Sequence, residues 1–199
     1  MRKVLIPIFL PEFIFRLRIR LLLRYRRLRY GYAFRKIPLT QGKYAIVDPE
    51  DYEELAKYKW HTGRSERGLY AVRAVKARRS KTGQKTVSMH WVILKPPKGK
   101  FVDHINHNGL DNRRANLRVV TPQQNMWNMR KRRGNCSSKY KGVSWSKSES
   151  KWTARITCNN RWIFIGYFDD EKAAAMAYDA RAKELFGDYA VLNLPSSKE

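Results

Sequence analysis

Residues 102–128 read VDHINHNGLDNRRANLRVVTPQQNMWN, and this stretch decides how the rest of the chain is interpreted. A short apolar strand ends in Asp103 and His104, a polar loop follows, and a second short strand begins at Asn116. A helix is expected from the Thr-Pro pair at 121–122, because Thr is a good N-cap and Pro loses no hydrogen bond at the first helical position. The stretch therefore predicts the order strand, loop, strand, helix.

The polar residues of this stretch have the order and spacing of a known nuclease motif. The pair Asp103 and His104, followed by Asn116 and Asn125, resembles the HNH (ββα-metal) nuclease family, and the likeness extends over about residues 90–130. The resemblance implies that Asp103 and Asn125 hold one divalent metal ion. It also implies that His104 is the general base, and that Asn116 holds the loop so that the imidazole faces its water.

These residue types suit the hydrolysis of a phosphodiester. The reaction requires a deprotonated water on one side of phosphorus and neutralisation of charge on the other. A neutral imidazole accepts a proton near pH 7, and a carboxylate with an amide favours Mg²⁺ or Mn²⁺ over zinc. The alternative is a purely structural loop whose Asn residues serve turns. His90, in the apolar run SMHWVIL, is expected to be packed or to support the site, and His107 is assigned no role.

The charge balance predicts a polyanionic partner. The 199 residues include 42 Lys and Arg against 17 Asp and Glu, a formal net charge of +25, which is more than solubility requires. Double-stranded DNA is the expected partner, with affinity that falls by about 10³ to 10⁵ between low and moderate salt if roughly six to ten phosphates are contacted. Cys136 and Cys158 make neither a disulfide framework nor a zinc site, and they fit a reduced intracellular setting.

Residues 1–36 differ from the rest of the chain, because they hold 11 Lys and Arg and a single acid, Glu12. The apolar run at 4–15 is interrupted by Pro7, Pro11 and Glu12, so it is too short and too broken to span a bilayer. The composition fits a basic amphipathic arm that lies on DNA or on an anionic membrane surface. A cleaved signal fits less well, because no small-residue cleavage site follows. We expect an extension outside the folded core.

From residue 37 the pattern becomes that of a folded domain, which we place at 37–130. Short strands are expected at 37–39 and 44–47, followed by a helix that starts at 48–50 and runs to Tyr58. Residues 69–75 and 86–94 are expected to be strands or mixed apolar segments. The basic residues near them either form a phosphate-facing rim or belong to a solvated loop, and these are Arg73, Lys76, Arg78, Arg79 and Lys81.

The basic stretch 131–139 is predicted to be a linker that can touch a nucleic-acid backbone. Residues 140–195 then contain three strand-like runs, YKGVSWSK, KWTARITC and RWIFIGYF, before DDEKAAAMAYDARAKELFG. The last run predicts a helix that is capped by Asp169 or Asp170 and ended by Gly187. One face of this helix is expected to carry Ala174, Ala177, Tyr178, Arg181 and Leu185.

The last two strands are predicted to form a hairpin with its turn at Asn159 and Asn160, since Asn tolerates the positive φ that such turns need. Pairing of Cys158 with Arg161 places Ile156 opposite Ile163 and Ala154 opposite Ile165, and this aliphatic side belongs under the helix. The open side then carries Arg155, Thr157, Trp162, Phe164 and Lys151. Aromatic and basic side chains on an uncovered sheet are typical of a nucleic-acid surface. Alternatively, the aromatic residues pack against the nuclease domain or a partner.

A second resemblance covers essentially all of residues 140–195. The segments YKGVSW, WTARI, IGYF, AAAMAYD and LNLP are similar to the AP2/ERF DNA-binding domain, whose sheet reads the major groove. Ser144 stands where an Arg is usual, and Trp162 and Phe164 occupy the Arg and Trp places of the third strand, so the plant recognition sequence is not carried over. The resemblance implies DNA contacts from Lys141, Ser144, Arg155, Thr157, Trp162 and Phe164.

The sequence therefore predicts an α+β protein, with a ββα-metal HNH nuclease domain followed by a three-stranded antiparallel sheet packed on one helix. The expected function is that of a metal-dependent, homing-type DNA endonuclease that the C-terminal domain directs to its site. We expect a monomer or weak dimer in the cytoplasm of a bacterial or phage-infected cell, with no small-molecule cofactor and no stable membrane insertion. The alternatives are a DNA-binding regulator with an inactive nuclease fold and, less favoured, an RNA-binding protein.

Overall fold

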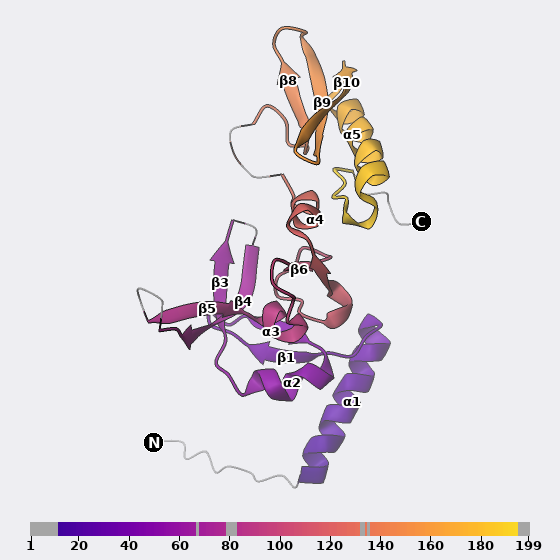
Figure 1. The fold of residues 1–199 in the computed structure, drawn as a ribbon. Coiled ribbons are helices and arrows are strands. Elements are labelled where there is room, and N and C mark those ends of the chain that lie inside the picture. The colour runs from indigo at the N-terminus through magenta and orange to yellow at the C-terminus, as the bar shows by residue number, and fades with distance from the viewer. Residues whose placement is uncertain (1–11, 67, 79–82, 132–133, 135, 195–199) are drawn as a thin grey trace, which may run out of the picture. The chain divides into compact units, whose positions relative to one another are not determined.

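The structure is a computed structural model that describes residues 12–66, 68–78, 83–131, 134 and 136–194. The chain divides into two compact units (Figure 1). The first unit comprises residues 1–95 and 104–118, and the second comprises residues 96–103 and 119–199. The chain therefore passes from one unit to the other after Lys95, after Asp103 and after Arg118. The predicted α+β class is confirmed.

The N-terminal basic segment forms helix α1, Glu12–Tyr30, none of whose residues is buried. Near its C-terminal end, the Arg26 guanidinium donates to the carbonyl of Phe34 and lies 4.3 Å from the centre of the Phe34 ring. Among the described residues, no helix is long and apolar enough to cross a membrane. The function of this segment stays a prediction.

The first folded elements lie close to where the sequence predicts them. Strand β1, Arg35–Pro38, pairs antiparallel with β2, Tyr44–Val47. Helix α2, Pro49–Ala56, follows Asp48 and ends two residues before the predicted end at Tyr58. Leu55 and the side chain of Trp60 are buried, and the Trp60 indole donates to the Leu55 carbonyl at 2.8 Å, which anchors the end of this helix.

A three-stranded antiparallel sheet follows, in the order β3-β4-β5. Its strands are β3, His61–Ser65, β4, Gly68–Lys76, and β5, Gln84–Ser88. The sequence analysis missed β3 because HTGRS has no apolar alternation. Residues 86–94, which were expected to be a strand or a mixed apolar segment, are divided between the end of β5 and helix α3, Met89–Leu94, which buries Met89, His90 and Ile93.

The order strand, loop, strand, helix predicted for residues 102–128 is confirmed. Strand β6, Phe101–His104, forms a two-stranded sheet with β7, Leu117–Val120, and the loop between them ends in a 3₁₀ turn, Arg114–Asn116. Helix α4, Pro122–Trp127, begins with a capping box. The Thr121 side chain accepts from the Gln124 backbone N–H at 3.1 Å, and the Gln124 side chain accepts from the Thr121 N–H at 2.8 Å, an arrangement that satisfies two otherwise unpaired donors.

The C-terminal part of the second unit is a three-stranded antiparallel sheet in the order β10-β9-β8, with helix α5 along one face (Figure 1). The strands are β8, Val143–Ser146, β9, Lys151–Cys158, and β10, Arg161–Phe168. Helix α5, Glu171–Phe186, is capped by Asp170 and ends at Gly187. A short 3₁₀ turn, Gly187–Tyr189, follows. The predicted sheet on one helix is confirmed.

Two details of this domain differ from the prediction. Cys158 pairs with Arg161 as expected, but a bulge between Phe164 and Gly166 places Gly166, and not Ile165, opposite Ala154. The core face of α5 also differs, because the helix rests on the sheet along a stripe with i, i+4 spacing. That stripe consists of Ala174, Tyr178, Ala182 and Phe186, together with Ala175.

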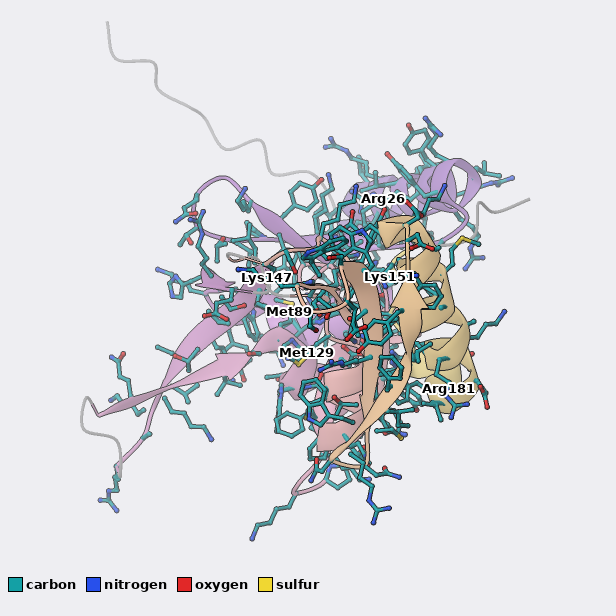
Figure 2. All side chains as sticks on the ribbon, turned by 90° about the horizontal axis from the view of Figure 1, so that it is seen from above. Arg26, Met89, Met129, Lys147, Lys151 and Arg181 are labelled. Atoms are coloured by element: carbon teal, nitrogen blue, oxygen red, sulfur yellow. The ribbon has the colours of Figure 1, made fainter. Side chains whose placement is uncertain are left out.

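Arg181, which was predicted on the core face of α5, instead lies on the side of α5 that is turned away from the sheet (Figure 2). Its guanidinium forms an ion pair with Glu184, one turn further along the helix, at 2.6 Å. Ala177 and Leu185 are only half-buried beside the buried stripe. A half-buried, charged residue at this position follows from the i, i+4 stripe, since Arg181 falls outside it.

Candidate active site and nucleic-acid interface

The loop between β6 and β7 is closed on itself by Asn116, whose side chain is buried. Its amide oxygen accepts from the backbone N–H of Asn106 at 3.0 Å, and its amide nitrogen donates to the carbonyl of Asp111 at 2.8 Å. The Asn116 carbonyl also accepts from the N–H of Ile105 at 2.9 Å. One side chain thus bonds two separate points of the loop backbone, which holds the loop in a single path.

The same loop is attached to the N-terminal elements of the first unit. The backbone N–H of Asn112 donates to the carbonyl of Ile46 in β2 at 2.8 Å. Arg114 makes two hydrogen bonds to Asp51 of α2, at 2.7 and 2.8 Å, and this pairing raises the pKa of Arg114. The residues before the motif therefore serve as its support, because β2 and α2 hold the loop from outside.

Asp111 is a buried acid of the loop that the sequence analysis did not single out. Its carboxylate binds the Arg113 guanidinium through two hydrogen bonds of 2.6 and 2.8 Å, and the side chain is 4% exposed. The hydrogen bond to Asp111 raises the pKa of Arg113, and the guanidinium also lies 3.5 Å from the centre of the Tyr32 ring. A bidentate buried pair of this kind is strongly directional, so it adds to the rigidity of the loop.

His104, the predicted general base, is buried, with 5% of its surface exposed. Its Nε2 lies 3.4 Å from the side-chain oxygen of Asn112, which is completely buried. An amide oxygen can only accept a hydrogen bond, so a bond at this position requires the proton on Nε2. The role of Asn112 was not predicted from the sequence, because its contact with His104 depends on the path of the folded loop.

His90 lies against His104 within the first unit. The two rings meet edge to face, with 4.8 Å between their centres and an angle of 83°, and Tyr70 lies 5.9 Å from His90 and 5.8 Å from His104. Burial, and after it the charge of His104, lowers the pKa of His90 to about 3. The prediction that His90 is a packed histidine is confirmed. His107 adopts a positive φ of 60° as a turn residue of the loop.

In the second unit, the carboxylate of Asp103 is held by Asn128. The Asn128 amide nitrogen donates to Asp103 Oδ2 at 2.6 Å, and Asn128 is 5% exposed. Asn125 lies in the first turn of α4, half-buried, with its backbone N–H bonded to the Thr121 carbonyl at 3.0 Å. Asn128 was not predicted from the sequence, although it follows Asn125 by three residues and residues three apart on a helix share a face.

The donor set of Asp103 and Asn125 fits a hard divalent cation. A carboxylate and an amide offer oxygen ligands only, and Mg²⁺ in particular is commonly held by one or two carboxylates while it keeps several waters. In the described part of the chain, no group of three or more His, Cys, Asp or Glu residues could hold a metal ion. The oxygen donors of these two residues therefore suit a divalent metal ion.

The open face of the C-terminal sheet presents large aromatic side chains to solvent. Trp162 is 76% exposed and Phe164 is 53% exposed. Lys151, on the neighbouring strand, forms an ion pair with Asp169 at 3.2 Å. The predicted DNA contacts that the structure exposes on this sheet are Ser144, Lys151, Arg155, Thr157, Trp162 and Phe164.

Lys141 differs from the other predicted DNA contacts. Its ammonium group donates to the carbonyl of Trp127 at 2.7 Å, and burial lowers its pKa to about 8. A second lysine, Lys131, donates to three backbone carbonyls, those of Ser138, Tyr140 and Val143, at 2.8 to 3.2 Å. At its first residue, the predicted linker 131–139 is thus tied to the domain that follows.

The three described members of the predicted basic rim near β4 have different surroundings. The Arg73 guanidinium lies 3.8 Å from the centre of the Tyr58 ring and 5.6 Å from that of Trp60, so Arg73 packs on aromatic residues of its own unit. Lys76 and Arg78 are exposed. The remaining two members of the predicted rim, Arg79 and Lys81, lie outside the described residues.

Comparison with known proteins agrees with these observations. The profile of a family described as HNH endonuclease matches residues 95–127. An uncharacterized HNH endonuclease of Acanthamoeba polyphaga mimivirus is 33% identical over 156 residues, which cover 77% of this chain and 76% of that protein. The chain belongs to the HNH endonuclease family. Protein 3.8 of Escherichia phage T7 is 36% identical to this HNH family member over 94 residues, or 47% of this chain and 76% of that protein.

The HNH family member also carries an AP2/ERF-like region. Dehydration-responsive element-binding protein 2D of Arabidopsis thaliana is 45% identical over 65 residues, which cover 32% of this chain and 31% of that protein. An AP2-like ethylene-responsive transcription factor of the same plant is 31% identical over 83 residues, or 42% of this chain and 24% of that protein. Both resemblances stated from the sequence are therefore confirmed.

Proposed function

We propose that this HNH family member is a metal-dependent DNA endonuclease whose AP2/ERF-like domain locates the site of cleavage. The supporting observation is the combination, on one chain of net charge +25, of a rigidly held HNH loop and an exposed aromatic sheet face. A nuclease motif supplies hydrolysis, and a sheet that presents Arg155 and Trp162 to solvent supplies contacts to bases and backbone. Together, the two parts would cleave DNA at sites that the sheet recognises.

His104 is the proposed general base. Its buried ring is oriented by Asn112 at Nε2, so Nδ1 accepts the proton of the attacking water. Asn116 maintains the path of the loop on which the imidazole is carried, through its bonds to the backbone at Asn106 and Asp111. Because these bonds are directional, the imidazole is oriented before substrate binds, which removes an entropic part of the barrier.

Asp103 and Asn125 are the proposed metal ligands, and Asn128 orients the Asp103 carboxylate through the 2.6 Å hydrogen bond. When bound, the metal ion polarises the scissile phosphate and stabilises the leaving 3′ oxygen. A partner that holds a metal-binding carboxylate in one orientation commonly changes metal affinity or activity by about 10- to 100-fold when it is removed. One such site cuts one strand, so a monomer nicks DNA and two assembled copies break both strands.

DNA binding is proposed to rest on the exposed sheet face and on the overall positive charge. Arg155 and Lys151 contact phosphates or base edges, while Trp162 and Phe164 contact bases or sugars. Counterion release then makes the affinity fall steeply with salt, by about 10³ to 10⁵ if roughly six to ten phosphates are neutralised. We expect the protein where such DNA is present, in the cytoplasm of a bacterial or phage-infected cell.

Plasmid cleavage by the purified protein tests this proposal. Wild-type protein with Mg²⁺ or Mn²⁺ is expected to convert supercoiled plasmid into nicked or linear DNA, and EDTA is expected to abolish the conversion. His104→Ala should lose about 10²-fold or more in rate while it still shifts duplex DNA, and a His104→Ala, Asn125→Ala double variant should be inactive. A library of randomised duplexes ensures that a cleavable site is present.

Two results would contradict parts of the proposal. Near-wild-type cutting by His104→Ala would exclude His104 as the base. Sequence-specific binding without cutting by either metal, across the whole library, would instead show a DNA-binding regulator with an inactive nuclease fold. Preference for RNA over duplex DNA in competition at fixed salt would exclude both.

A further inference from the structure

Helix α4, which carries the proposed metal ligand Asn125, is docked on the AP2/ERF-like domain within the second unit. The Trp127 ring at the end of α4 stacks on the Phe186 ring of α5, with 4.5 Å between the ring centres and an angle of 13°. Phe186 belongs to the buried cluster of the domain, which also includes Ile156, Tyr178 and Ala182. Trp127 therefore extends the domain core into the nuclease motif.

Hydrogen bonds hold both ends of α4 on the same domain. At its C-terminal end, the Lys141 ammonium group donates to the Trp127 carbonyl at 2.7 Å, which satisfies one of the carbonyls that every helix end leaves unpaired. In its first turn, the Gln123 side chain donates to the side-chain oxygen of Asn159 in the β9–β10 turn at 2.5 Å. The hydrogen bonds at the two ends of α4, together with the Trp127–Phe186 stack, define one orientation of α4 on the AP2/ERF-like domain.

A groove of about 930 Å³ lies between α4 and the sheet of the same unit. Pro122, Gln123 and Met126 line it from the helix. Ser144, Arg155 and Trp162, which are predicted DNA contacts, line it from the sheet. The predicted DNA contacts of the sheet therefore border the helix that carries Asn125.

We propose that Trp127 is a positioning residue that fixes α4 on the AP2/ERF-like domain and thereby sets the distance along DNA between the sequence read and the bond cut. This inference rests on the proposed function. A flexible connection would let the cutting helix reach a range of positions, because the ends of such a linker are broadly distributed. The Trp127–Phe186 stack and the two hydrogen bonds restrict that range, so the length of the stretch 131–139 does not control the distance.

Mapping of cut positions tests the proposal in the full-length protein. Wild type, Trp127→Ala and the control Trp145→Ala select sites from a randomised duplex library, and sequencing gives both the bound motif and the cut. Trp145 is an exposed tryptophan of the same unit, whose ring contacts that of Trp152. We expect wild type and Trp145→Ala to cut at one offset from the motif, whereas Trp127→Ala binds the same motif but cuts at several offsets.

An insertion and a conservative variant sharpen this test. A Gly-Ser pair inserted after Gly134 should leave the wild-type offset unchanged and widen the spread of Trp127→Ala. Trp127→Phe keeps a ring for the stack and should restore the single offset. A single unchanged offset in Trp127→Ala, or a shift of the wild-type offset with the insertion, would overturn the proposal.

A second measurement does not depend on hydrolysis. The two native cysteines are removed by Cys136→Ser and Cys158→Ala, and Met126→Cys then provides a single thiol on α4. Iron-EDTA tethered to this thiol produces hydroxyl radicals that cut bound DNA near α4. The marks should fall in a narrow window and broaden when Trp127→Ala is added. If the protein does not hydrolyse DNA but its radical marks fall in a narrow window, the proposed function is refuted and this inference is retained. If the window of marks is equally wide with and without Trp127→Ala, the inference alone is refuted. If Trp127→Ala does not fold, Gln123→Ala, which removes the bond to Asn159, takes its place in the comparison, and equal widths would again refute the inference.

Discussion

The HNH loop of the first unit and the AP2/ERF-like domain of the second are stabilised in different ways. The loop buries Asp111, Asn112 and Asn116, and it is held by hydrogen bonds from these side chains. The C-terminal domain is instead held by a core of small aliphatic and aromatic side chains between α5 and the sheet. The directional polar network of the loop fixes the position of one functional group, His104. The apolar core of the C-terminal domain supports a sheet surface that carries several functional side chains.

This difference determines how each region responds to substitution. Loss of one partner in the loop leaves another buried polar group unsatisfied, which costs about 1–3 kcal/mol and moves the loop. Truncation of a large side chain in the C-terminal core costs about 2–5 kcal/mol of stability. It weakens the support of the whole sheet face and does not act on one surface residue. We therefore expect changes in the loop to act mainly on cutting, and changes in the core of the domain to act on stability and DNA binding together.

The largest effect is expected from Gly142→Ala in the C-terminal domain. Gly142 has a φ of +74°, and a Cβ there would lie 2.2 Å from the Tyr178 ring and 2.5 Å from the Arg155 carbonyl oxygen. Overpacking and a left-handed backbone together should lower the free energy of unfolding by about 3–4 kcal/mol, and DNA binding should fall with it. Urea unfolding measures the loss. Gly134→Ala, with no atom within 4 Å of the added Cβ, is the control, and equal stability of the two variants would refute the packing argument.

Gly109→Ala is the matching change in the HNH loop and should be somewhat milder. A Cβ at Gly109 would lie 2.4 Å from the Leu69 carbonyl oxygen and 2.5 Å from the Tyr70 ring, but its φ is not in the left-handed region. We expect a loss of about 2–3 kcal/mol and a loop displaced from β4, with DNA cutting reduced and DNA affinity retained. A gel-shift titration beside a cleavage assay separates the two. If affinity falls as much as cutting, the two regions do not respond separately.

Asn112→Ala tests the role of the polar network in orienting His104. Removal of the side-chain oxygen near Nε2 lets the imidazole change tautomer, so the cleavage rate should fall by about 10- to 100-fold, with DNA affinity unchanged. The pH dependence of the rate is the decisive readout, because a residue that orients the base shifts the profile of the rate with pH. A uniform fall at every pH would indicate only a general loss of loop structure.

The smallest effect is expected from the titration of His90. Its pKa of about 3 in the folded protein is below the ordinary value of 6.5, so the unfolded chain binds more protons between these values. Stability is therefore complete well above pH 6.5 and is lost as the pH falls through and below that value, by about 1 kcal/mol at pH 5.5.

Comparison of the unfolding transitions of wild type and His90→Phe isolates the contribution of His90. Urea unfolding at pH 7.5 and 5.5 should show the loss in wild type and not in His90→Phe. All four histidines of the chain, at positions 61, 90, 104 and 107, belong to the first unit, so the transition of the AP2/ERF-like domain should not change through His titration. An equal loss in His90→Phe would refute the assignment.

The sequence predicted well those features that depend on neighbours along the chain. The cap of α4 at Thr121, the helix stop at Gly187 and the hairpin turn at Asn159 and Asn160 all follow from local backbone preferences. The strand order of the HNH motif and the pairing of Cys158 with Arg161 follow from periodicity and turn length. These signals lie within a few residues of the structure that they determine.

The errors occurred where packing overrides the local pattern. The apolar run MHWVIL left strand and mixed apolar segment open, and it forms α3, in which Met89, His90 and Ile93 are buried together. The bulge before Gly166 shifts the pairing of β10 with β9 by one residue. A glycine is only a weak sequence signal for such a bulge. The core face of α5 is rotated from the predicted one because the stripe from Ala174 to Phe186 packs on the sheet.

By itself, the sequence determined the HNH and AP2/ERF-like identities, the α+β class and the residues that carry the proposed chemistry, since each rests on residue type and spacing. Only the tertiary structure decided what supports those residues. Asn112 meets His104, Asn128 meets Asp103 from 25 positions away, and Trp127 stacks on Phe186 of a later helix. A hydrogen bond or ring stack forms only when both partners lie within a few ångströms, and only folding brings residues distant in sequence that close.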